Sequence, residues 1–132
     1  MEDLAARNVG LVASAFDAIG RGDAEALAEL FTPDAVWHTQ RRGAMSGDKV
    51  GLQAIGAFFA ETMQRTGGTF RSTPIDVMGS EHRVAVYART TASRDGEELD
   101  DLQVLLCTVE GQRIADIRHF VGDPLAAERF WS

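Results

Sequence analysis

The sequence predicts an α+β domain in which N-terminal helices cover one face of a curved β-sheet. Two observations support this prediction. Apolar residues recur at helical spacing in the N-terminal half, and segments typical of strands, separated by short turns, fill the C-terminal half. The chain has 132 residues, enough for one hydrophobic core, so we expect a single domain over residues 1–132.

Three helices are predicted in the N-terminal half. The first spans residues 3–20, where an apolar stripe runs along one face, and the sequence "GRGD" ends it. Asp23 is a suitable N-cap for a second helix through "AEALAELF", and Pro33 marks its end. A third helix begins at Leu52 and ends at "TGG", residues 66–68. A short tail helix, "DPLAAERFW", is predicted near the C-terminus.

A short strand, "DAVWHT" at residues 34–39, separates the second and third helices. The loop after it carries Arg41, Arg42 and Met45, and the sequence leaves open whether these residues close over a ligand. Four more strands are predicted, and their short links indicate an antiparallel meander: "TFRSTPIDVM", "RVAVYARTTAS", "ELDDLQVLLCTV" and "RIADIRHFVG". Pro74 cannot donate a ladder hydrogen bond, so its strand is expected at an edge or with a bulge.

Charge and composition exclude several classes of function. With 20 acidic against 13 basic residues the net charge is −7, so nucleic acid is not expected as a partner. No apolar run reaches the roughly 20 residues of a membrane span, and we expect a soluble cytoplasmic protein without a membrane partner. The single cysteine, Cys107, is expected in the core. His38, His82 and His119 form no metal-ligand motif, so neither a metal nor a cofactor is expected.

Three stretches resemble a known family: "GDAEALAELFTPDAVWH", "GLQAIGAFF" and "EGQRIADIRHFVGDP". They are similar to the second helix with the first strand, the third helix and the final hairpin of the NTF2-like superfamily, and SnoaL-like polyketide cyclases are the closest group. The resemblance implies a cone-shaped fold with a pocket for a small apolar molecule. It also implies a homodimer that pairs through the outer surface of the sheet, where Tyr87, Leu105 and Cys107 or their opposite-face neighbours would lie.

The family includes ketosteroid isomerases, but their catalytic residues are not matched. The positions of their tyrosine, general-base aspartate and protonated aspartate fall on Ala15, Thr39 and about Val104. None of these side chains can take over the proton chemistry, so steroid isomerisation is not expected. For an epoxide hydrolase network of two aspartates and an arginine, Asp101 and Asp116 could supply the acids, but no arginine lies at matching spacing. Arg89 or Arg118 could serve only if their strands turned the opposite faces inward, and this alternative stays open.

His119 is the main candidate for acid–base catalysis, because an imidazole can take or give a proton near neutral pH. Its side chain is expected on the cavity face of the last strand. An acidic neighbour among Asp100, Asp101 and Asp116 is expected to determine its charge, with Asp100 and Asp101 as the catalytic candidates. On the preceding strand, alternation separates the row of Asp100 from the row of Asp101 and Gln103. The sequence does not fix which row faces inward.

Six residues are candidates for contact with a ligand: Trp37, His38, Phe59, Met63, Gln103 and Val121. His38 is the weaker one, because strand alternation turns it away from Trp37. Two functions remain open. One is a cofactor-independent enzyme that acts by proton transfer on an apolar oxygenated molecule, by cyclisation, isomerisation, dehydration or epoxide opening. The other is a noncatalytic binding or dimeric assembly module, in which His119 is a core or interface histidine.

Overall fold

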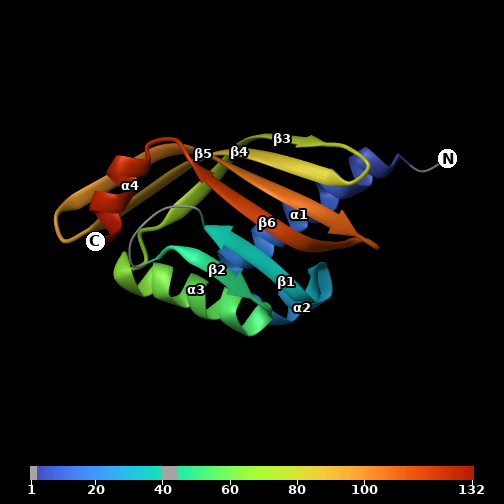
Figure 1. Ribbon diagram of the computed structural model, residues 1–132, viewed down its shortest axis with the longest axis horizontal. Coiled ribbons are helices and arrows are strands. Elements are labelled where there is room, and N and C mark those ends of the chain that lie inside the picture. The colour runs from blue at the N-terminus through green and yellow to red at the C-terminus, as the bar shows by residue number, and fades with distance from the viewer. Residues whose placement is uncertain (1–2, 40–44) are drawn as a thin grey trace.

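The computed structural model describes residues 3–39 and 45–132, which form four helices and six strands (Figure 1). The helices are α1 (Leu4–Arg21), α2 (Ala24–Leu30), α3 (Leu52–Arg65) and α4 (Pro124–Trp131). The strands are β1 (Phe31–Thr39), β2 (Gly47–Val50), β3 (Arg71–Gly79), β4 (Arg83–Arg94), β5 (Glu97–Glu110) and β6 (Arg113–Val121). The predicted α+β class is confirmed.

All six strands belong to one sheet, in the order β2-β1-β6-β5-β4-β3. The predicted antiparallel meander from β3 to β6 is confirmed. However, the sheet is not antiparallel throughout, because β1 lies parallel to β6. In the meander, β6 has a neighbour on one side only, namely β5. Strand β1, from the N-terminal half of the chain, pairs with the other edge of β6.

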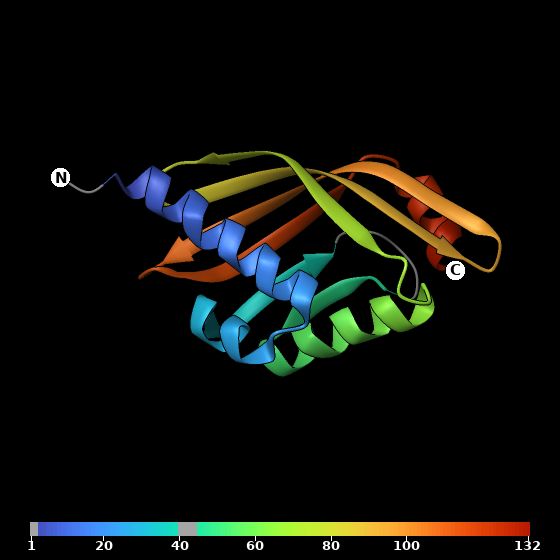
Figure 2. The same ribbon diagram turned by 180° about the vertical axis from the view of Figure 1, so that it is seen from behind.

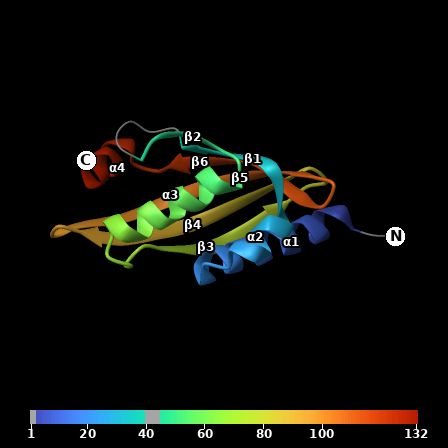
Figure 3. The ribbon, with the colours of Figure 1, turned by 90° about the horizontal axis from the view of Figure 1, so that it is seen from below.

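The first three helices cover one face of the curved sheet, as predicted (Figure 3). Seen from behind, α1 crosses the sheet beside β3 and β4 (Figure 2). The approach is close at Gly79, where a Cβ atom would lie 2.7 Å from Cγ2 of Val9 and 2.9 Å from the carbonyl oxygen of Ala5. Buried Asn8 fixes the same contact by donating to the carbonyls of Ser80 and Glu81, at 3.0 and 2.9 Å. The helix is therefore held tightly on the sheet.

One predicted boundary was wrong, and one strand was not predicted. The second helix ends at Leu30, and Phe31 begins β1, where it pairs with Ile114 of β6. The predicted loop after β1 contains the additional strand β2, which hydrogen-bonds to β1. Arg41 and Arg42 lie outside the described residues, whereas Met45 is buried.

Pro74 behaves as the sequence predicts. Its strand, β3, lies at an edge of the sheet, and the register with β4 shifts between Pro74 and Asp76. Cys107 is fully buried in the core, and burial, together with the charge of Asp116, raises the pKa of its thiol to about 12. In the described part of the chain, no helix is long and apolar enough to cross a membrane.

Candidate functional site

A cavity of about 640 Å³ lies between the helices and the inner face of the sheet. This volume is typical of pockets that hold small molecules. The wall is mostly aromatic and aliphatic, and its main apolar side chains are Trp37, Phe58, Phe59, Met63, Leu99 and Leu105. Thr90, Gln103 and His119 add polar groups from three neighbouring strands. A smaller cavity of about 260 Å³ between α2 and α3 offers no titratable side chain among its described lining residues.

The polar groups of the large cavity form a continuous hydrogen-bonded chain. Nε2 of His119 lies 2.6 Å from Oε1 of Gln103, and the same oxygen accepts a 2.9 Å hydrogen bond from the hydroxyl of Thr90. Nε2 of Gln103 donates to Oδ2 of Asp101 at 3.1 Å. All four side chains are buried. The row of Asp101 and Gln103 therefore faces inward, which resolves the alternative that the sequence leaves open.

The hydrogen bonds from Asp101 through Gln103 determine which ring nitrogen of His119 carries the proton. As a carboxylate, Asp101 can only accept hydrogen bonds, so it orients the amide of Gln103 with NH₂ toward Asp101 and oxygen toward His119. An oxygen at that place requires a proton on Nε2 of His119. In the neutral imidazole, Nδ1 then carries the lone pair and is the atom able to accept a proton.

Gly122, directly after β6, holds Asp101 in place. Its backbone N–H donates to Oδ2 of Asp101 at 3.0 Å. A Cβ atom at this position would lie 2.4 Å from the carbonyl oxygen of Leu102 and 2.7 Å from Oδ1 of Asp101. Only glycine allows this approach without displacement of the carboxylate.

Trp37 lines the cavity and is 5% exposed. Its ring packs edge-on against His119 and Phe59, with centroid separations of 6.0 and 5.1 Å. Among the described residues, its buried indole N–H has no hydrogen-bond partner. Because buried indole N–H groups usually find an acceptor, this donor is suited to an oxygen atom of a ligand.

Asp100, the other acidic candidate on this strand, does not face the cavity. It lies on the outer face of β5, where Arg89 of β4 donates to both carboxylate oxygens at 2.8 and 2.6 Å. The hydrogen bond and positive charge of Arg89 lower the pKa of Asp100, although partial desolvation opposes them. Asp101, in contrast, lies on the inner face and is buried.

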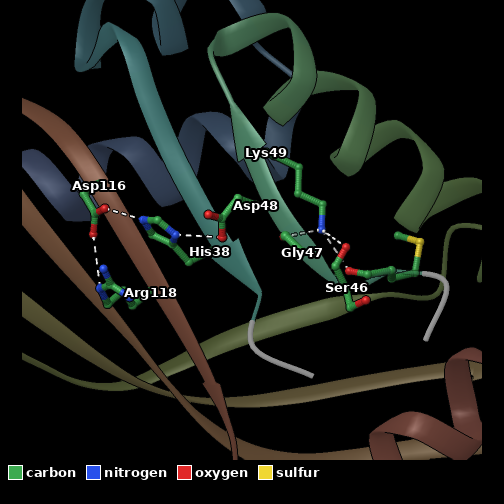
Figure 4. Close-up of polar contacts among 8 residues, drawn as sticks. His38, Ser46, Gly47, Asp48, Lys49, Asp116 and Arg118 are labelled. Atoms are coloured by element: carbon green, nitrogen blue, oxygen red, sulfur yellow. Dashed lines mark hydrogen bonds and ion pairs between the residues drawn. The ribbon is translucent and has the colours of Figure 1, made fainter. Parts of the chain in front are cut away.

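His38, another ligand-binding candidate, is not among the lining residues of the cavity. Its side chain lies between two aspartates (Figure 4). Its Nδ1 is 2.8 Å from Oδ1 of Asp48 on β2, and its Nε2 is 2.6 Å from Oδ2 of Asp116 on β6. Burial lowers the pKa of His38, but the hydrogen bonds and charges of both aspartates outweigh it and raise the pKa above its usual value. A protonated His38 thus links β2, β1 and β6.

Lys49, on β2 beside this cluster, fixes the entry to the strand (Figure 4). Its ammonium group donates to the carbonyls of Met45, Ser46 and Gly47 at 2.8–3.0 Å. It also lies 4.4 Å from the ring centroid of Phe58, on the cavity wall. These contacts stabilise the segment next to the cavity.

The remaining ligand candidates divide into two groups. Phe59 and Met63 line the cavity, as Gln103 does, whereas Val121 packs against the core cluster and is not part of the lining. Sequence reasoning did not single out Thr90, although it shares the inner row of β4 with Val86 and Ala88. Within the described ranges, no three His, Cys, Asp or Glu residues are grouped so that they could hold a metal ion.

Comparisons with known proteins give a consistent result. The family model described as "SnoaL-like domain" matches residues 12–117. An uncharacterised protein of Mycobacterium tuberculosis is 35% identical over 127 residues, which cover 95% of this chain and 96% of that protein. The solved structure of Bal32a, from a soil-derived mobile gene cassette, is 34% identical in sequence and superposes with a TM-score of 0.94. The match covers 98% of this chain and 100% of the Bal32a chain. An NTF2-like protein from Burkholderia xenovorans LB400 shares the fold at 23% identity, with a TM-score of 0.83 and coverage of 97% and 98%.

Proposed function

The chain belongs to the SnoaL-like family, and from this premise we propose that its cavity binds a small, largely apolar, oxygenated molecule on which His119 transfers a proton without a cofactor. The observation that carries the proposal is the buried chain from Asp101 through Gln103 to His119 at the wall of an otherwise apolar cavity. Perturbed or oriented titratable groups in such cavities are typical of acid–base sites.

In this proposal His119 is the catalytic residue. Its Nδ1 takes a proton from a carbon next to a carbonyl group, and the electron pair of that C–H bond moves onto the carbonyl oxygen. The indole N–H of Trp37 donates to the oxygen as its negative charge develops. Return of the proton from Nδ1 to another carbon of the enolate completes an isomerisation. In a cyclisation the enolate carbon forms a bond to a second carbonyl carbon of the same molecule, and the proton goes to the new alkoxide oxygen. In a dehydration the electron pair expels a hydroxyl group from the next carbon, and the proton goes to that group, which leaves as water.

Asp101 and Gln103 are positioning residues. Neither needs to touch the reacting atoms, because together they keep the proton of His119 on Nε2 and hold the ring still. An apolar wall strengthens this arrangement, since hydrogen bonds and charges act more strongly where water is excluded. Phe59 and Met63 shape the space for the ligand.

The proposal can be tested with 5-nitrobenzisoxazole, a small apolar compound that reports on a base in a cavity. Removal of its C3 proton breaks the N–O bond and yields a coloured cyanophenolate, so no co-reactant is required. We expect wild-type protein to accelerate this elimination and His119→Gln to lower the rate by about 100-fold or more, the usual contribution of a general base. His82→Gln is the matched control, because His82 is exposed in the turn before β4.

Equal rates for wild type and His119→Gln would contradict catalysis by His119. The noncatalytic alternative would then be favoured, in which the same cavity only holds its ligand. Circular dichroism of each variant distinguishes lost chemistry from lost folding.

We also propose that the protein forms a homodimer in the cytoplasm. Apolar and aromatic side chains gather on the outer face of β4, β5 and β6. We call them the outer-face patch: Tyr87, Leu102, Val104, Leu106 and Phe120. Leu102 and Phe120 are 47% and 42% exposed, which is unusual for such large apolar side chains unless a second copy covers them. Leu105 and Cys107, the other candidates for this surface, are buried on the inner side. A single buried thiol is compatible with a reducing compartment.

A further inference from the structure

The charges around the large cavity are unlike those of the protein as a whole. The chain carries a net charge of −7, yet the described residues of the cavity wall include no aspartate or glutamate. They do include two arginines, Arg21 at the end of α1 and Arg71 at the start of β3. Both are exposed and lie beside Gly20, Gly22, Met63 and Ser72, which are also exposed and mark the mouth of the cavity.

The two arginines differ in their partners. Arg21 forms ion pairs with Asp17 and Asp23, so its charge is already compensated. Arg71 has no carboxylate partner among the described residues, and only its Nη1 is engaged. That atom donates to the carbonyl oxygens of Gly68 and Phe70, at 2.9 and 2.7 Å.

These two hydrogen bonds have a geometric consequence. They fix the guanidinium plane through Nη1 and leave the edge formed by Nε and Nη2 without a partner in the described chain. Two parallel N–H groups on one edge of arginine match the two oxygens of a carboxylate. A guanidinium that is already held in place loses less side-chain entropy when it binds such a group.

We propose that the ligand of this cavity is an acidic amphiphile, whose carboxylate binds the Nε–Nη2 edge of Arg71 while its apolar body fills the space toward Trp37 and His119. This inference rests on the proposed ligand-binding role of the cavity and adds the chemical class of the ligand. The opposite end of the ligand carries an oxygen that can accept from the indole N–H of Trp37.

The test uses two probes with the same aromatic body, 1-pyrenebutyrate and its methyl ester, and follows their fluorescence anisotropy. The acid is expected to bind about tenfold more tightly than the ester, as one bidentate arginine pair at a partly exposed site allows. Arg71→Gln should remove this preference by weakening the acid alone. Arg71→Lys should restore only part of it, because lysine keeps the charge but lacks the paired donors.

Two further variants keep the result specific. Arg83→Gln removes the same charge from an exposed position outside the cavity wall and should leave both affinities unchanged. Met63→Trp adds bulk at the mouth, where Met63 is 41% exposed, and should weaken both probes. If Met63→Trp leaves both unchanged, the probes bind elsewhere and the inference is wrong.

The outcomes also separate the inference from the function on which it rests. Ester and acid that bind equally, with no effect of Arg71→Gln, would overturn the acidic class of ligand and leave the cavity as a binding site. Failure of both probes to bind would contradict the binding role itself, and the inference with it.

Discussion

Gly122→Ala provides the sharpest test of the chain that orients His119. The added methyl carbon would lie 2.4 Å from the carbonyl oxygen of Leu102 and 2.7 Å from Oδ1 of Asp101. The first atom belongs to the backbone of β5 and cannot move without disturbing the sheet. The carboxylate of Asp101 or the end of β6 must therefore shift.

The expected magnitude follows from the hydrogen bonds that this shift breaks. Asp101 accepts from the N–H of Gly122 at 3.0 Å and from the amide of Gln103 at 3.1 Å. Leaving a buried polar group without its partner costs about 1–3 kcal/mol. Because Gly122 itself is exposed and water can replace part of the loss, we expect a decrease of about 2–4 kcal/mol in the free energy of unfolding.

Urea unfolding followed by tryptophan fluorescence measures this change. For a domain of this size, the loss corresponds to a midpoint lower by about 1–2 M urea at an unchanged slope. Gly10→Ala is the matched control, since Gly10 is exposed in α1. Among the described residues, no atom outside the neighbouring helix backbone lies within 4 Å of its added Cβ. That variant should gain up to about 1 kcal/mol, because alanine favours a helix more than glycine does.

The same two variants can be compared in the elimination of 5-nitrobenzisoxazole. Without urea the Gly122→Ala variant should be fully folded and still catalyse the elimination more slowly than wild type, because His119 loses its fixed orientation. If Gly122→Ala unfolds within about 0.5 kcal/mol of wild type, the close approach is tolerated. The role assigned to Gly122 and Asp101 would then be refuted.

Two other features can be tested in solution. The folded-state pKa of His38 is raised by Asp48 and Asp116, so the stability it contributes is fully present below its unfolded pKa of about 6.5 and is lost as pH rises through the folded pKa. In urea titrations, His38→Gln should therefore lose more stability at about pH 6, where the imidazole is protonated, than at about pH 8.5, where it is neutral. An equal loss at both pH values would contradict the proposed link between the strands. Leu102→Glu places a charge in the outer-face patch and should convert the proposed dimer to a monomer by light scattering, whereas Glu98→Gln, on an exposed position of the same strand, should not. A wild-type protein that is already monomeric would contradict the proposed dimer.

Local patterns were sufficient to predict most elements of this fold. The apolar stripe of α1 and the N-cap of Asp23 depend on residues a few positions apart, and the structure confirms both. Pro74 predicted an edge strand or a bulge because proline has no amide proton to donate to a neighbouring strand, and this depends on that residue alone. Strand β2 escaped prediction, since its four residues carry no apolar alternation and are held by pairing with β1.

The candidate site was predicted only in part. Alternation divided β5 into a row with Asp100 and a row with Asp101 and Gln103, but it is symmetric with respect to the two faces of a strand. The packing of helices on one face decided that Asp101 is buried and Asp100 meets Arg89. His38 could be assigned to the side opposite Trp37, yet its partner Asp116 is 78 positions away in the chain.

The sequence by itself determined the helices, most strands, the single thiol and the choice of His119 as the group proposed to transfer a proton. These properties arise from neighbouring residues or from the chemistry of one side chain. Only the tertiary structure decided which atoms meet. Gly122 meets Asp101, which lies 21 positions earlier in the chain on β5. The Nε–Nη2 edge of Arg71, which has no partner in the described part of the chain, results from the path of the turn before β3. Such contacts depend on how the sheet and helices pack together, which no local pattern encodes.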